Sequence, residues 1–247
     1  MPLIQHISTR CWWLASDYLV HTNKFHRWCA VAVAGVVALL IGCFIAFAVA
    51  EKYQLKDSFF YGALQFSFID GGHPETFAYG LELAASMIFV WIAWVHHKKH
   101  WYAFAGILLV VFFDDAFQLH ETIGHSLVVN FSVSPSVGDL GGFATTGLLS
   151  AVFWVFGVLK IESDDELCAY LLFTVYFAIL IFFGVGVDAL HGMFNGNGMQ
   201  TLFTLLEDGG ELVMTAVLSL SALGMLLRQR QSATAAKMPI NSMYSKL

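Results

Sequence analysis

Residues 112–125, FFDDAFQLHETIGH, place several ionisable side chains in an otherwise apolar stretch. Four polar residues in it have the i, i+4, i+7, i+11 spacing of one helix face: Asp114, Gln118, Glu121 and His125. This spacing predicts a single polar stripe along a continuous α-helix. Carboxylates and imidazoles transfer protons and bind metal ions, so the stripe is a candidate reaction centre.

Further pairs of the same residue types occur later in the chain. Asp188 and His191 are spaced i, i+3, and Glu207 and Glu211 are spaced i, i+4. Side chains at these separations share a helix face, so each pair can point towards one site. Glu82 is a single acid within another apolar stretch.

The elements that must position these residues are membrane-spanning helices. Hydrophobic residues make up 58% of the 247 residues and charged residues only 12%, with a mean hydropathy of +0.69. A soluble domain of this size is less apolar, so we predict an all-α, polytopic integral membrane bundle. The few Lys and Arg residues form no basic stripe, so nucleic acid is not an expected partner.

Six apolar segments are predicted to cross the bilayer. The first, residues 29–50, has no charge and is long enough for a hydrocarbon core of ~30 Å. An interfacial segment, 1–28, precedes the transmembrane domain, 29–227, and a polar, disordered tail is expected over 228–247. The predicted spans are 29–50, 76–95, 101–126, 143–159, 167–193 and 200–227.

The basic residues predict the orientation of this bundle. They flank alternate ends of the spans, which places the amino and carboxyl termini in the cytoplasm by the positive-inside rule. Lys52 and Lys56 are exceptions in the first outer loop. We therefore expect a protein of the cell inner or plasma membrane, in contact with membrane lipid; the sequence also allows a homo-oligomer.

With this topology the acids and histidines share one depth, the outer half of the membrane. A carboxylate at the middle of a span costs ~2.5–3.5 kcal/mol on insertion scales, and like charges in one pocket repel each other. Bound divalent metal ions would neutralise the acids, and mixed carboxylate and imidazole ligands suit iron or zinc. The expected metal ligands are Glu82, Glu121, His125, Asp188, His191, Glu207 and Glu211.

This ligand set loosely resembles the ferritin-like dimetal proteins, in which two helices each give a Glu and two others each give Glu-x-x-His. Only Asp188-x-x-His191 has that spacing here, with Asp in place of Glu. The resemblance implies a two-metal centre in a bundle core.

Individual residues also have plainer interpretations. Glu82 can simply hydrogen-bond a neighbouring helix. Asp115, Asp208 and His120 are expected to support ligands or face water rather than bind metal. Gly184 and Gly186 are first expected to allow close helix packing.

Three functions follow from these expectations. The favoured one is a metal-dependent oxidoreductase, with a carboxylate and histidine site, acting on a lipophilic small molecule; Asp114, Glu121 and Glu207 are its candidate catalytic residues. The second is a zinc-dependent lipid hydrolase with Asp114 or Glu207 as the base. The third is a cation or proton transporter.

Overall fold

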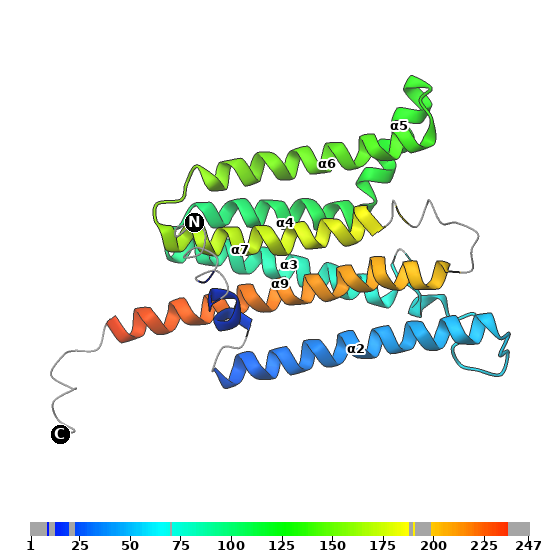
Figure 1. Ribbon diagram of the computed structural model, residues 1–247, viewed down its shortest axis with the longest axis horizontal. Coiled ribbons are helices and arrows are strands. Elements are labelled where there is room, and N and C mark those ends of the chain that lie inside the picture. Colours follow the sequence, from blue (N-terminus) through cyan, green and yellow to red (C-terminus); the bar gives the residue numbers. More distant parts are fainter. Residues whose placement is uncertain are drawn as a thin grey trace.

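The computed structural model is an elongated bundle of helices (Figure 1). It describes residues 9, 13–19, 23–69, 71–187, 190 and 199–236, and within these it contains helices and no strands. Six helices in this described part are long and apolar enough to cross a membrane, as the sequence predicts. The elements are α2 (Lys24–Lys52), η1 (Leu64–Phe66), α3 (His73–Val95), α4 (His100–Phe117), α5 (Leu119–Phe131), α6 (Pro135–Val158), α7 (Asp164–Ile181), η2 (Phe182–Val187) and α9 (Gln200–Ala236).

Helix boundaries follow local capping chemistry. The side chain of Asn23 accepts a hydrogen bond from the backbone N–H of Phe25 and starts α2. Proline lies in the first turn of both α3 and α6, where a backbone N–H would have no hydrogen-bond partner within the helix. Ser163 caps α7.

The ends of two spans differ from the prediction because apolar length is a poor guide to where capping occurs. Helix α2 begins at Lys24, within the segment expected to be interfacial. Helix α9 continues to Ala236, so the first part of the predicted disordered tail, 228–236, is helical; the rest of the tail lies outside the described residues.

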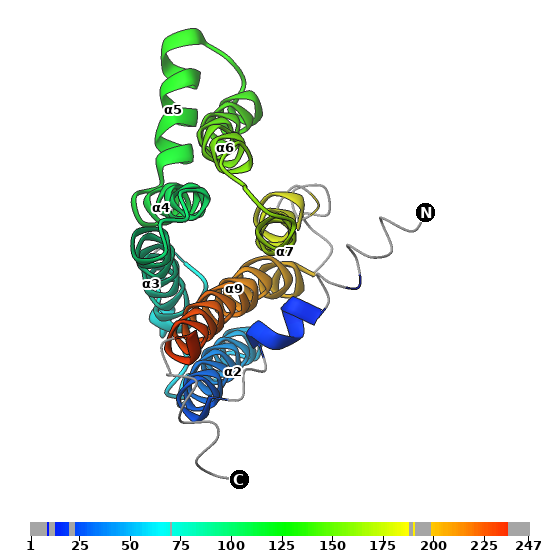
Figure 2. The ribbon, with the colours of Figure 1, turned by 90° about the vertical axis from the view of Figure 1, so that its left-hand side faces the viewer.

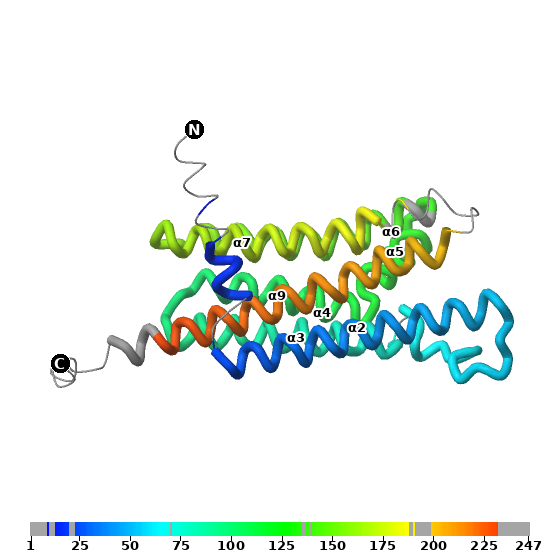
Figure 3. Tube along the Cα trace, turned by 60° about the horizontal axis from the view of Figure 1, so that its bottom comes forward, coloured from blue at the N-terminus to red at the C-terminus, as the bar shows by residue number. Residues whose placement is uncertain are grey.

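Figure 2 looks along the bundle. Helix α9 packs against α2, α3, α7 and η2, while α4 packs against α3 and α6, and α6 also against α5. Helices α6 and α7 are not among the closely packed pairs of the described residues. Figure 3 shows α2 lying alongside α9, with residues 53–69 extending beyond it.

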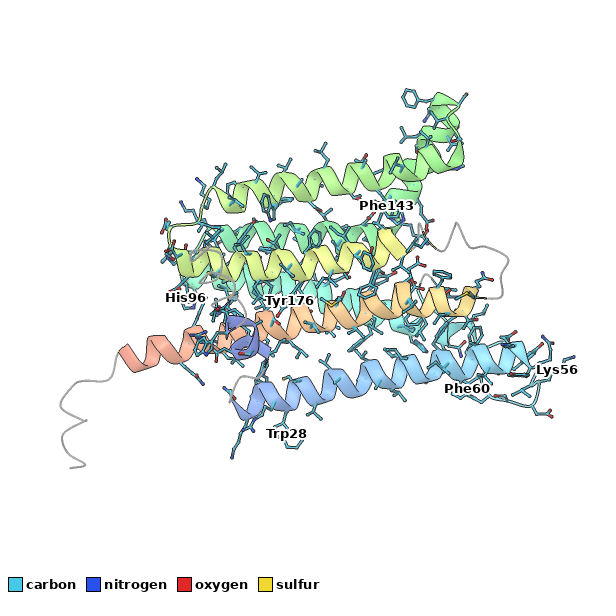
Figure 4. The ribbon with its side chains drawn as sticks, in the orientation of Figure 1. Trp28, Lys56, Phe60, His96, Phe143 and Tyr176 are labelled. Atoms are coloured by element: carbon cyan, nitrogen blue, oxygen red, sulfur yellow. The ribbon has the colours of Figure 1, made fainter. Side chains whose placement is uncertain are left out.

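The two ends of the bundle are chemically different. We call the end where α3 and α9 begin and α4 finishes the acidic end. The core of the opposite half is apolar and aromatic, and its largest fully buried side chains include Tyr170, Phe89, Phe104 and Phe173. Tyr176 lies between α7 and α9 at mid-length (Figure 4). The opposite half is therefore closed by packed side chains.

Candidate functional site

A cavity of about 1230 Å³ lies in the acidic half of the bundle. Helices α3, α4, α5, α6, α7, η2 and α9 all contribute to its walls. Phe143, one of the lining residues, lies where α6 approaches the rest of the bundle (Figure 4). Neither Lys nor Arg lines the cavity among the described residues, whereas the lining acids are Glu75, Glu82, Asp114, Asp115, Glu121, Glu207, Asp208 and Glu211.

Glu82 of α3 and Asp115 of α4 form a carboxyl pair in this cavity. Their carboxyl groups are within hydrogen-bonding reach of each other. An ionised carboxylate only accepts hydrogen bonds, so a hydrogen bond between the two requires that one of them carry a proton. Glu82 is 2% exposed, and its Oε2 atom has no hydrogen-bond partner. The pair thus places two carboxyl groups side by side, with a buried oxygen of Glu82 that no donor among the described residues reaches.

Glu211 of α9 completes the group, which we call the carboxyl cluster: Glu82, Asp115 and Glu211. Its charge acts on Glu82, and the charge of Asp115 acts on Glu211. The space for its carboxyl group comes from Gly184, because a Cβ atom at that position would meet Glu211 Oε1. Gly184 lies in η2, a π-helical turn, and such turns occur frequently at functional sites. Gly184 is thus confirmed as a close-packing position, with a carboxyl group as the packed partner.

The predicted continuous polar stripe is wrong, because the helix breaks at Gln118. That residue has φ 51° and ψ 46°, the left-handed region, which separates α4 from α5. Asp114 Oδ1 accepts a 2.8 Å hydrogen bond from the backbone N–H of His120 and lies 3.1 Å from His120 Nδ1. Asp114 therefore caps the first turn of α5. Such a hydrogen bond from side chain to backbone replaces a helical one, and the spacing of apolar residues does not reveal it.

Two further contacts fix this elbow between α4 and α5. The ring of His120 stacks on Phe143 of α6, with centroids 4.3 Å apart. Gly142 lies against the His120 carbonyl, where a Cβ atom would not fit. The stacking on Phe143 holds the imidazole at the cavity wall, and the close approach at Gly142 keeps the backbones of α5 and α6 together.

The Asp114–His120 pair predicts a pH-dependent contact. The hydrogen bond to Asp114 raises the pKa of His120 above its ordinary value of 6.5. The stability that this bond contributes is therefore fully present below pH 6.5 and is lost as the pH rises through the folded-state pKa. Histidine NMR titration should show His120 titrating above 6.5 in the wild type and nearer to 6.5 in Asp114→Asn. A wild-type value at or below 6.5 would contradict the contact.

The other predicted site residues separate into groups. Glu207 lines the cavity, and its charge acts on Glu211. Glu121 and His125 also line it, but from α5 beyond the break, with exposed side chains. Asp188 and His191 lie outside the described residues. Within the described part, no three His, Cys, Asp or Glu side chains are arranged to hold one metal ion.

The plainer interpretation of Glu82, a hydrogen bond to a neighbouring helix, stays a prediction beside the metal-ligand one, with Asp115 of α4 as the partner within reach. Asp115 and His120, expected only to support ligands or to face water, both lie at the cavity. Asp115 points away from the expected stripe, and His120 gains its partner only because the chain turns at Gln118. The adjacent residues Asp114 and Asp115 could have indicated two separate contacts, because consecutive side chains on a helix point in different directions.

Comparison with known proteins gives a family but no activity. No curated protein matches the chain, and no solved structure matches it. One family model, described as a domain of unknown function (DUF8692), matches residues 28–226, which include the carboxyl cluster. Because that match covers most of the chain, the protein belongs to the DUF8692 family.

Proposed function

We propose that this protein is an integral membrane enzyme that acts on a lipophilic substrate at the carboxyl cluster. The observation that carries the proposal is the hydrogen-bonded Glu82–Asp115 pair, which lies beside Glu211 in a cavity without Lys or Arg among its described lining. Ionisable groups at membrane depth are costly, and they mark functional sites by default. Glu82 also lines this cavity, and its buried Oε2 atom has no hydrogen-bond donor among the described residues.

The proposed orientation places the acidic end outside the cytoplasm, in the inner or plasma membrane of the cell. It is supported by basic residues at the opposite end, including Lys24 at the start of α2, Lys98 between α3 and α4, and Arg228 late in α9. Both termini are then cytoplasmic.

A divalent cation is the proposed partner of the cluster, whose described carboxyl groups are not arranged around one ion in this structure and would have to draw together to ligate it. Carboxylates must lose their protons to ligate a metal, so a cation would replace the proton that Glu82 and Asp115 share. Glu207 lies close enough to Glu211 for its charge to act on that carboxyl group. Bound metal would act as a Lewis acid or activate oxygen, and the carboxyl groups would orient it and move protons. Iron favours the oxidoreductase, whereas zinc favours hydrolysis.

Metal analysis tests this assignment. Protein purified without chelators should contain near-stoichiometric iron or zinc. Glu82→Gln and Glu211→Gln should each lower metal affinity by about 10–100-fold or more, because each removes a charged ligand. Glu162→Gln, whose parent side chain is 79% exposed at the opposite end, is the control and should retain the metal. Wild-type protein without metal would overturn the metal-dependent proposal.

The Asp114–His120 pair favours zinc-dependent lipid hydrolysis as the second candidate. A carboxylate that hydrogen-bonds Nδ1 orients the ring and leaves Nε2 as a general base. His120, rather than Asp114 itself, is then the base that activates water. In that case His120→Gln should remove turnover while leaving zinc bound.

A transporter is less well supported. Transport requires a polar route through the opposite half, where Phe89, Phe104 and Phe173 are fully buried in a packed aromatic core. Buried hydroxyls do continue beyond the cluster along α9, at Thr215 and Ser221. These hydroxyls lie within helix α9, and the aromatic core beside them leaves no described cavity through the opposite half.

A further inference from the structure

We infer that the cavity opens sideways into the bilayer between α6 and α7, and that it admits one hydrocarbon chain of a lipid whose head group is not anionic. This inference rests on the proposed function and specifies its substrate class. It concerns the mouth of the cavity, where several residues line the interior and are also exposed on the bundle surface. These residues are Ala144, Gly147 and Ala151 of α6, together with Ala178 and Val185 of α7 and η2.

The inner end of this opening is closed by side chains. Trp154 Nε1 donates a 3.0 Å hydrogen bond to Thr174 Oγ1, and Tyr170 Oη donates a 2.8 Å bond to the Trp154 carbonyl. Towards the acidic end, α6 leans on α4 and α5, whereas α7 packs on α9. The two helices that border the opening thus meet at this inner contact and pack on different neighbours elsewhere, and they lie apart when the bundle is viewed along its length (Figure 2).

The opening lies close to the depth of the carboxyl cluster. Gly106 of α4 faces Phe153 of α6. The two helices are antiparallel, so the same number of residues from this contact towards the acidic end leads to Asp115 on α4 and to Ala144 on α6. Asp115 and Ala144 therefore lie at about the same depth. Gly147 lies one helical turn from Ala144. A chain that enters beside Gly147 therefore reaches Asp115 without crossing the packed core.

The lining changes from polar to apolar along the cavity. Beyond the cluster the walls include Val110, Val111, Phe177, Leu180 and Leu212. From Leu140 to Trp154, the α6 wall is ~21 Å long at 1.5 Å per residue, and the volume exceeds the ~300–1,000 Å³ of most small-ligand sites. The shape fits an extended apolar chain with its polar head at the cluster.

Charge restricts that head group. Eight acids line the cavity and no Lys or Arg does within the described residues, so the site stays negative even with one divalent cation bound. An anionic head would be repelled. An alcohol or amine donates hydrogen bonds to carboxylates, so we assign the site to single-chain lipids with such heads.

Gly147 provides a test that does not disturb packing, because nothing lies within 4 Å of a Cβ atom built there. A tryptophan at this position would fill the opening. Gly42 of α2 is the matched control, since it is also exposed with nothing within 4 Å and does not line the cavity. Both variants add the same side chain to a lipid-facing helix.

The experiment is photo-crosslinking in phosphatidylcholine nanodiscs with a long-chain alcohol that carries a diazirine near its chain end. Mass spectrometry should locate labels on Phe177 and Leu180 in the wild type and in Gly42→Trp. Gly147→Trp should reduce these labels roughly tenfold or more, the factor for ~1.4 kcal/mol of lost binding. The matched fatty acid should label only the outer helix surfaces.

Equal labelling of Phe177 in Gly147→Trp, or equal labelling by the alcohol and the fatty acid, would overturn the inference. So would a disulfide between two copies carrying Gly147→Cys, because a neighbouring chain would then cover the opening. Glu82→Gln separates this inference from the proposed function. It should lose metal and keep the cavity labels. A wild type that binds metal but shows no cavity labels would support the metal centre and overturn the lipid entrance.

Discussion

Gly184→Ala is expected to lower metal affinity by about 10–100-fold while changing the free energy of unfolding by less than about 1 kcal/mol. The added Cβ atom meets Glu211 Oε1, the flexible end of a side chain, so the carboxyl group moves and the backbone does not. Glu211 would leave its place beside Asp115. Competition with a chromogenic chelator measures the affinity, and thermal unfolding measures the stability.

Two variants show whether the effect runs through Glu211. Gly186→Ala is the control in the same π-helical turn, because its added Cβ approaches only the Phe182 ring, at 3.2 Å. It should bind metal like the wild type. Adding Glu211→Asp to Gly184→Ala shortens the acid by one methylene and should recover part of the affinity. Unchanged affinity in Gly184→Ala would place Glu211 outside the centre.

Replacement of Glu82 is expected to separate stability from function. Glu82→Ala leaves the buried Asp115 without its partner, which should cost about 1–3 kcal/mol. Glu82→Gln keeps the shape and supplies an amide N–H₂ that donates to an ionised Asp115, so its stability should stay near that of the wild type. Both variants should lose turnover and bound metal.

Thermal unfolding of the two variants in the same nanodiscs measures this difference, with intrinsic tryptophan fluorescence as the signal. Equal destabilisation by Ala and Gln would mean that the hydrogen bond to Asp115 contributes nothing. Stability of Glu82→Ala equal to the wild type would show that the acid is not paired.

The bundle could be predicted from the sequence because apolar length alone separates membrane helices from loops. The 22 uncharged residues of 29–50 and the aromatic stretch around Phe104 both lie in helices as expected. The sequence also predicted that Glu82 and Glu211 lie at a similar depth, because the helical rise converts their distance from the span ends into a depth. Both residues line one cavity.

The path of the chain after Asp114 could not be predicted in the same way. Continuous helical periodicity and a break at Gln118 give the same pattern of residue types, and the break depends on the side chain of Asp114 capping His120. That turn moves Glu121 and His125 onto α5, away from the expected stripe. It also gives Asp115, not Asp114, to the carboxyl cluster.

The most direct test of the central claim is the infrared spectrum of the purified, metal-stripped protein at neutral pH. If Glu82 and Asp115 share one proton, the wild type shows the carbonyl stretch of a protonated carboxylic acid. In a Glu211→Gln background, which removes the third buried acid, both Glu82→Gln and Asp115→Asn should remove this band, because the remaining carboxylate can accept from an amide, and Glu162→Gln should keep it. A wild type without the band, or a band that survives both substitutions, would contradict the shared proton and the centre built on it.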